Sequence, residues 1–270
     1  LSSQVQAQVF EARMRGYSSA LARSLSTDNI PETVYRTLVT TVNENLPTLH
    51  RYLKLHARVK KINKPSYYDV YPAIASLNQK YDIDDAHLLL SEALVPLGQD
   101  YRNLYLESVG KGWMHVKPGE RKRSGAYAMS AAYDVHPYLL LNHNDDFNSV
   151  STFAHEWGHG MHSLLTQQHQ PFSKAEYTTF IAEIASISHE LLLYEHLIEK
   201  AATQQEKLFY LFEELQGLRG TFFRQTQFAE LELAIHEEVE NGGALSADKL
   251  NKIYGETLKR YYGHDLGVVQ

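Results

Sequence analysis

The chain has 270 residues, 43% of them hydrophobic, a formal net charge of −6 and no cysteine. It is long and apolar enough to bury a substantial core, as one large domain or two small ones. The absence of cysteine excludes disulfides, thiolate metal sites and cysteine nucleophiles, and the charge pattern shows no footprint for nucleic acid.

The N-terminus, Leu1–Phe10, has neither an initiator Met nor the basic start and apolar stretch of a signal peptide. No apolar run approaches the ~18 residues that a membrane span needs. We therefore expect a cytoplasmic protein without nucleic-acid or membrane partners. The missing Met predicts a processed or excised piece of a longer protein.

Apolar residues recur at helical spacing through residues 1–110, which predicts a helical scaffold. The second helix contains Pro47, which should kink or divide it. Its basic end (Lys54, Arg58, Lys60 and Lys61) is interpreted as a solvated face that complements the helix dipole. The helices are predicted over 5–25, 29–62, 83–97 and 99–109.

The composition changes after Gly110, and residues 111–145 contain three short runs between turn residues. These runs predict strands at 113–116, 125–129 and 137–142. We expect them to form a small antiparallel sheet set into a helical protein.

Residues 146–270 return to helical spacing. The first helix of this stretch can be capped by Asn148 or Ser149. Further helices are predicted over 177–200, 204–240 and 246–261. Because no Gly/Ser-rich linker separates the three stretches, residues 1–270 are not expected to contain independent linked domains.

The first of these helices contains His155-Glu156-Trp157-Gly158-His159, the pattern His-Glu-x-x-His. At this composition the pattern would arise by chance roughly one time in twenty, so alone it is a hypothesis. On a helix, the two histidines lie one turn apart and project from the same face. Two imidazole ligands and an adjacent carboxylate are what a zinc peptidase needs.

A catalytic zinc site usually takes three protein ligands and leaves one position open. Glu183 lies among small and apolar neighbours on the next helix, where an ionised carboxylate needs a partner. We expect it to be the third ligand, although it could instead be a surface residue. Seven residues on, Glu190 could accept a hydrogen bond from a ligand imidazole, and His162 has either a supporting role there or a packing role.

These groups support amide hydrolysis, with one Zn²⁺ per chain activating water and Glu156 acting as general base. The oxyanion needs a further donor, a Tyr or His that the motif does not supply.

Taken together, His155–His162, Phe180–Ser186, Lys122–Tyr127 and His136–Asn142 resemble the oligoendopeptidase F branch of the thimet oligopeptidase and neurolysin family. The resemblance extends over essentially the whole chain, and it implies that residues 1–270 are a single catalytic-domain fragment, with 1–110 as helical scaffold, 111–145 as small sheet and 146–270 as zinc-site helices. It implies a mainly α, helical zincin-type metallopeptidase with a small sheet beside the active-site helix and a deep cleft for short to medium oligopeptides.

Residue by residue, the resemblance assigns His155, His159 and Glu183 as zinc ligands and Glu156 as general base. It assigns Gly125, Ala126 and Tyr127 to the strand along which substrate backbone lies. The family's N-terminal lobe, and its C-terminal segment with the oxyanion-stabilising Tyr and His, have no counterpart here. We therefore expect an intact metal site in an incomplete cleft that is weakly active or inactive alone, with the remaining fragments of the enzyme as partners.

Two alternatives to a zinc metalloendopeptidase stay open. A related helical zinc carboxypeptidase or dipeptidase would need a pocket for a peptide terminus. A non-catalytic helical peptide-binding module would contain the His-rich helix by coincidence.

Overall fold

The computed structural model describes residues 1–130 and 132–270, and its regular structure is helical apart from three short strands. The chain divides into two compact units, which are described separately. One unit comprises residues 1–74 and 215–270, and the other comprises residues 75–214. The predicted organisation as a single catalytic domain built from three successive stretches stays a prediction.

In the first unit, the predicted helix over 5–25 is interrupted. Gly16 adopts a left-handed backbone conformation with φ of 78°, and Ser19 begins a new helix by accepting a hydrogen bond from the Ala22 N–H at 2.9 Å. The predicted division near Pro47 is confirmed, because one helix ends at Glu44 and the next starts at Leu46. The helices are α1 (Ser2–Met14), α2 (Ala20–Ser26), α3 (Glu32–Glu44), α4 (Leu46–Val59), α10 (Gln225–Glu240) and α11 (Ala247–Tyr262), with a π-helical segment (Arg219–Arg224) leading into α10 and 3-10 turns at Tyr67–Val70 and His264–Leu266.

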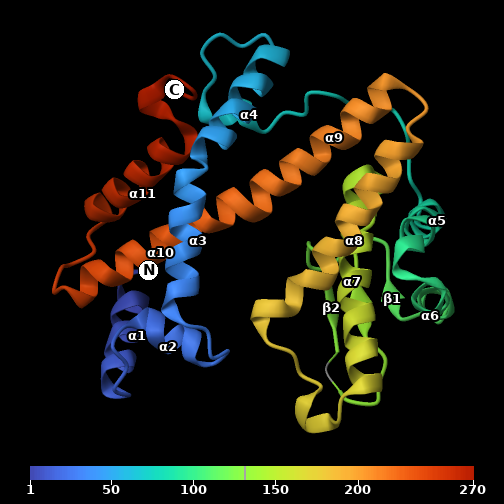
Figure 1. The fold of residues 1–270 in the computed structure, drawn as a ribbon, viewed down its shortest axis with the longest axis horizontal. Coiled ribbons are helices and arrows are strands. Elements are labelled where there is room, and N and C mark those ends of the chain that lie inside the picture. Colours follow the sequence, from blue (N-terminus) through green and yellow to red (C-terminus); the bar gives the residue numbers. More distant parts are fainter. Residues whose placement is uncertain (131) are drawn as a thin grey trace. The chain divides into compact units, whose positions relative to one another are not determined.

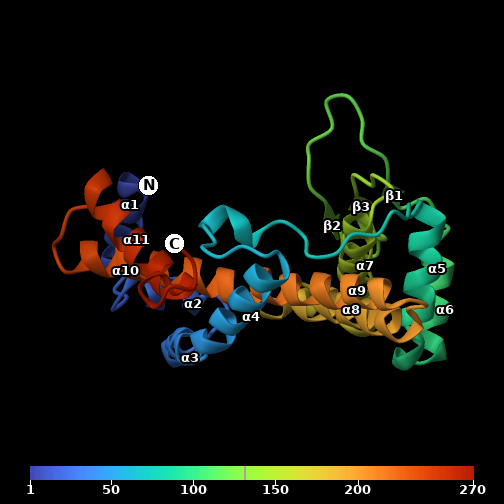
Figure 2. The same cartoon turned by 90° about the horizontal axis from the view of Figure 1, so that it is seen from above.

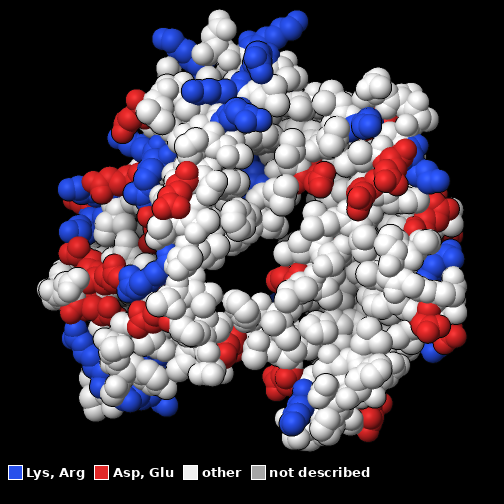
Figure 3. Space-filling model, viewed as in Figure 1, with Lys and Arg blue, Asp and Glu red and all other residues white. Residues whose placement is uncertain are grey.

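The first unit has two apolar clusters. Val5 and Val9 of α1 pack with Ile235 of α10, and Leu53 of α4 packs with Tyr261 of α11. The basic side chains near the end of α4 are exposed, as predicted, and Figure 3 shows them gathered over this part of the chain. Nowhere in the described residues is a helix both long and apolar enough for a membrane crossing.

The second unit is built around two long helices, α7 (Phe147–His169) and α8 (Thr179–Lys200), which run side by side (Figure 1). The other elements pack around this pair. They are α5 (Ile83–Ala93), α6 (Gln99–Val109), β1 (Met114–His115), β2 (Tyr127–Met129), β3 (Tyr138–Leu140), the larger part of α9 (Gln204–Leu218), and 3-10 turns at Val95–Leu97 and Phe172–Lys174.

The three predicted strands are present, but the sheet is mixed and the prediction of a purely antiparallel sheet is wrong. Its strand order is β1-β3-β2, with β2 antiparallel and β1 parallel to β3. The long connection between β1 and β2 allows this order, because it carries the chain past the position of β3 to the far edge (Figure 2). The Lys122 ammonium on this connection donates hydrogen bonds to the carbonyls of His115, Lys117 and Leu141, which fastens it to the strand ends.

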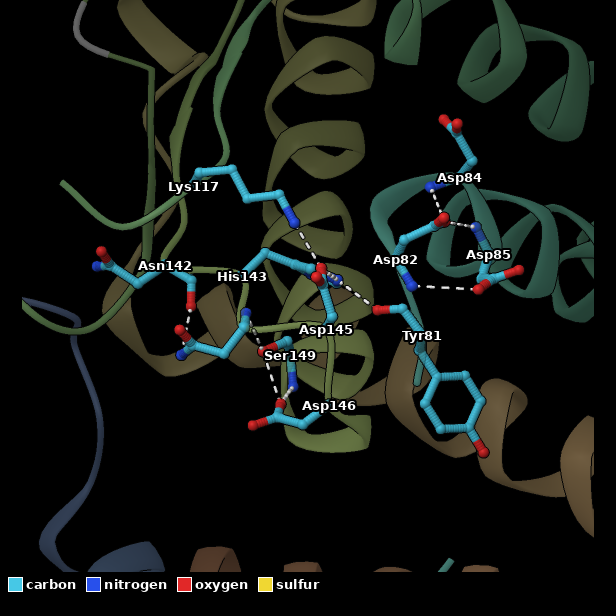
Figure 4. A network of polar contacts seen from close by, with 11 residues as sticks. Tyr81, Asp82, Asp84, Asp85, Lys117, Asn142, His143, Asp145, Asp146 and Ser149 are labelled. Carbon is cyan, nitrogen blue, oxygen red and sulfur yellow. Dashed lines mark hydrogen bonds and ion pairs between the residues drawn. The ribbon is translucent and has the colours of Figure 1, made fainter. Parts of the chain in front are cut away.

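The start of α7 is held by a polar network (Figure 4). Asp146 is the N-cap, and its carboxylate accepts hydrogen bonds from the N–H and the hydroxyl of Ser149 at 2.8 and 2.7 Å. Asn148 and Ser149 were the predicted caps, but both lie inside the helix because the backbone is already helical at Phe147. Behind the cap, Nε2 of the buried His143 lies 2.8 Å from the Tyr81 carbonyl.

The core of the second unit fixes which face of α7 points inward. Trp157 and Phe153 are fully buried, and the Trp157 ring lies edge-on to Tyr105 of α6 at 5.4 Å. The Trp157 indole N–H also donates to the sulfur of Met114 at 3.1 Å. This anchoring turns the opposite face of α7, with His155 and His159, toward α8 and the solvent.

Gly158 sets the distance between α7 and α8. A Cβ at this position would lie 2.5 Å from the Ser186 Cα and 2.7 Å from the Ala185 carbonyl oxygen, both in the backbone of α8. Gly160 differs, because its Cβ would meet only side chains, the nearest at 3.6 Å. Tight packing of the two helices therefore explains Gly158, inside the motif, but not Gly160, directly after it.

We predict that Gly158→Ala destabilises the protein by about 1–3 kcal/mol or more, because α8 must move away. Gly160→Ala is the matched control, and it should be neutral or stabilising by up to ~1 kcal/mol because alanine is the better helix former. Denaturant unfolding of both variants checks this difference. Equal stability of the two variants would contradict the assigned role of Gly158.

Candidate metal centre

Three polar side chains from α7 and α8 meet at one point. Nε2 of His155 lies 3.2 Å from Nε2 of His159, and Oε2 of Glu183 lies 3.2 Å and 3.3 Å from these two nitrogens. Within the part of the chain that the structure describes, this trio forms the one group of at least three His, Asp or Glu side chains suited to a metal ion. The two helices thus bring together the three residues that the sequence predicted as ligands.

The spacing of the three atoms fits a metal of zinc's size. Tetrahedral ligands at the usual 2.0–2.2 Å from zinc are roughly 3.4 Å apart. The observed separations of 3.2, 3.2 and 3.3 Å are close to this value. Two imidazoles and one carboxylate are also the donor set of an open catalytic zinc site.

The outer ring nitrogen of His155 is held by a carboxylate. Nδ1 donates to Oε1 of Glu190 at 2.6 Å, which leaves the lone pair on Nε2, the atom that faces Glu183. Burial lowers the pKa of His155, but the hydrogen bond and charge of Glu190, with the charges of Glu156 and Glu183, outweigh burial and raise it. For His159, burial is the largest effect and its pKa is lowered.

Glu156 lies on the buried side of the histidine pair. It is 6% exposed, and its Oε2 has no hydrogen-bond partner among the described residues. Burial raises the pKa of this carboxyl to about 7, although the nearby His155 and a hydrogen bond from the Ala128 backbone oppose the shift. A divalent cation at the three neighbouring side chains would lower this pKa.

The edge of the sheet lies beside this carboxylate. β2 is at the edge of the sheet, where among the described residues no strand pairs with its outer side, and the backbone of Ala128 on β2 forms a hydrogen bond with Glu156. The predicted substrate residues Gly125, Ala126 and Tyr127 lead into β2, with Tyr127 as its first residue. Their role stays a prediction, but their strand lies next to the site.

His162 lies one turn after the motif. Its ring stacks on Tyr177 with a centroid distance of 3.8 Å and an interplanar angle of 13°. Its buried Nδ1 has no hydrogen-bond partner among the described residues, and burial lowers its pKa. These contacts agree with a packing role for His162, and its alternative role in supporting the metal site stays a prediction.

Three residues near the site were missed by sequence reasoning: Ala128, Ser151 and Tyr194. Ser151 precedes His155 by four residues on α7, and Tyr194 follows Glu190 by four residues on α8. Each therefore lies one helical turn from a residue that the sequence did single out, and this spacing was a usable signal. Ala128 gave no signal, because it acts through its backbone.

The comparisons with known proteins point to one family. A model of Peptidase family M3 matches residues 1–96 and 98–268 of the chain. Oligopeptidase PepF of Bacillus subtilis (strain 168) is 38% identical over 264 residues, covering 97% of this chain and 39% of that protein. Group B oligopeptidase PepB of Streptococcus agalactiae serotype III (strain NEM316) is 38% identical over 263 residues, covering 97% of this chain and 44% of that protein.

Solved structures agree with these matches. The crystal structure of oligoendopeptidase-F from Enterococcus faecium is similar with a TM-score of 0.67 and 31% identity, covering 97% of this chain and 38% of that one. The resemblance to oligoendopeptidase F and the predicted mainly helical fold are therefore confirmed. The chain spans about two-fifths of the length of the curated relatives it matches.

We predict that Glu183→Gln lowers Zn²⁺ affinity by about 10-fold or more, because the charged oxygen that faces both imidazoles is lost. Glu195→Gln is the matched control, since Glu195 is an exposed carboxylate on the same helix. Competition of each variant with a chromophoric chelator measures the affinity. An unchanged affinity of Glu183→Gln would remove Glu183 from the ligand set.

Proposed function

The chain belongs to peptidase family M3, and on that premise we propose that it carries the zinc site of a metalloendopeptidase that cleaves internal bonds of short to medium oligopeptides. The observation that carries the proposal is the convergence of His155, His159 and Glu183, with separations of 3.2 to 3.3 Å between the facing atoms. The names of the relatives, oligopeptidase and oligoendopeptidase, support the substrate class.

The two imidazoles and the carboxylate would hold one Zn²⁺. When bound in a site with an open position, zinc acts as a Lewis acid toward a carbonyl and lowers the pKa of water. The surrounding residues orient the ligand side chains. Glu190 fixes the tautomer of His155, so that Nε2 presents its lone pair, and the core contacts of Trp157 fix the rotation of α7.

Glu156 is proposed as the general base. It follows His155 directly, so it is on the same turn as the ligands but points toward the buried side of α7. Its Oε2, without a partner among the described residues, is the atom available to accept a proton from the attacking water. The same oxygen can then deliver this proton to the leaving amine, as general acid–base catalysis requires.

The free edge of β2 is proposed as the place where a peptide lies. An extended peptide can pair with an unpaired strand edge through its backbone, which gives affinity with little dependence on side chains. Residues 125–129 present this edge beside Glu156, and the side chains of Tyr127 and Met129 are about half exposed, at 48% and 49%. Such an arrangement suits substrates of varied sequence.

The experiment that tests the proposal is cleavage of an end-blocked, internally quenched peptide by the zinc-loaded protein that carries this chain. We expect cleavage at an internal bond, lost on chelation and restored by Zn²⁺. Cleavage only after one terminus is unblocked would favour the related carboxypeptidase or dipeptidase. Less than about half an equivalent of zinc in the purified protein, unrestored by added Zn²⁺, would count against any zinc hydrolase.

We predict that Glu156→Gln lowers kcat/KM for this peptide by about 10²- to 10⁴-fold, since the amide cannot accept the proton. The same variant should keep its zinc, because Glu156 is not one of the three converging side chains. Steady-state kinetics and metal analysis on one preparation check both statements. Loss of zinc together with activity would show that Glu156 acts as a ligand and not as a base.

A further inference from the structure

A chain of hydrogen bonds continues behind the candidate metal centre, on the side away from the three ligand atoms. Glu190 accepts the His155 Nδ1–H on Oε1 at 2.6 Å and the Ser151 hydroxyl on Oε2 at 2.9 Å. The Ser151 Oγ also lies 3.1 Å from the Tyr194 hydroxyl. Four residues, two from α7 and two from α8, thus form one continuous path from Tyr194 to His155.

The direction of each bond follows from counting protons. Ser151 has one hydroxyl hydrogen, and it points to the Glu190 carboxylate, which can only accept when ionised. The Ser151 oxygen must therefore accept from Tyr194. Burial raises the pKa of the Tyr194 phenol, which keeps it protonated and able to donate. Every bond in the path has one donor and one acceptor.

The far end of the path is closed to water. Ser151 is 8% exposed and Tyr194 is 7% exposed, whereas the Glu190 side chain is 22% exposed. The Ser151 hydroxyl therefore holds Glu190 from the core side, the Tyr194 hydroxyl holds Ser151 in turn, and water cannot readily replace either hydroxyl there. With both carboxylate oxygens fixed, Glu190 has one orientation in which it can meet His155.

We infer that Ser151 and Tyr194 are positioning residues for the metal site, acting through Glu190 on the tautomer and ring orientation of His155. The inference rests on the proposed zinc site and adds two residues to it that do not touch the metal. Partners of a ligand imidazole set both its basicity and its aim, so their loss weakens metal binding without removing a ligand.

The test compares Zn²⁺ affinity, by chelator competition, in the wild type and in Ser151→Ala, Tyr194→Phe and Glu190→Ala. We expect Glu190→Ala to weaken binding by about 10- to 100-fold and Ser151→Ala by about 10-fold, with a smaller loss for Tyr194→Phe. Ser163→Ala is the matched control, because Ser163 is a buried serine of α7 that contacts another tyrosine hydroxyl, that of Tyr177, at 3.1 Å. It should leave zinc affinity unchanged.

A double variant separates positioning from general packing. In the Glu190→Ala background, Ser151→Ala should cause no further loss of affinity, because its effect passes through Glu190. Two results would overturn the inference and leave the zinc site standing. One is an equal loss of Zn²⁺ affinity from Ser151→Ala in the wild type and in Glu190→Ala. The other is a wild type that binds zinc while Ser151→Ala and Tyr194→Phe bind it with unchanged affinity. A wild type that binds no zinc would overturn both the inference and the zinc site.

One readout needs no metal. The short hydrogen bond between His155 and Glu190 should give a strongly deshielded Nδ1 proton in the NMR spectrum of the metal-free protein. We expect this resonance to move upfield or broaden in Ser151→Ala and to stay in place in Ser163→Ala. A resonance that is identical in both variants would contradict the positioning role even if Ser151→Ala changed metal affinity.

Discussion

The structure of the second unit depends on the close approach of α7 to α8 at Gly158. The backbone of α8 occupies the space that any side chain at this position would need. Because Gly158 lies between Glu156 and His159, this close contact between the helices falls within the motif itself. Glu183 is on the next helix, three residues before Ser186, and the approach at Gly158 is what brings its carboxylate within reach of both imidazoles.

This close approach concentrates charge. Three carboxylates, of Glu156, Glu183 and Glu190, lie around two histidines, and each carboxylate has a different environment. Glu190 accepts hydrogen bonds on both oxygens, Glu156 is buried with a raised pKa, and Glu183 is half exposed beside Nε2 of both histidines. Clustering acceptors in this way is unfavourable unless a cation is shared among them. The unfavourable electrostatics and the zinc-like spacing therefore lead to the same proposal.

Much of the helical fold could be predicted from the sequence, because apolar residues at helical spacing mark the long helices and Pro47 marks the division between α3 and α4. The candidate ligands could also be predicted, since two of them lie one turn apart on one helix. Local sequence patterns did not predict two other features of the fold, a helix break and a strand pairing. Gly16 breaks a helix whose apolar spacing continues across it, and the parallel pairing of β1 with β3 depends on where a long loop leads.

The remaining features arise only when α7 and α8 are placed together. Ser151 and Tyr194 are 43 residues apart, and the contact between their hydroxyls beside Glu190 depends on the register of the two helices, which the sequence spacing of each helix does not specify. The Ala128 contact with Glu156 is a backbone contact and has no side-chain pattern at all. Residue spacing and the family resemblance both predicted Glu183 as the third ligand and spacing singled out Glu190, but neither revealed the contacts of Ser151 and Tyr194 behind Glu190.

The most direct test of the central claim is anomalous diffraction at the zinc edge from crystals grown with one equivalent of Zn²⁺. If these three side chains hold zinc, we expect a single strong peak about 2.0–2.2 Å from Nε2 of His155, Nε2 of His159 and a carboxylate oxygen of Glu183. A peak at any other group of side chains, or one bound to the histidines while Glu183 points away, would contradict the claim.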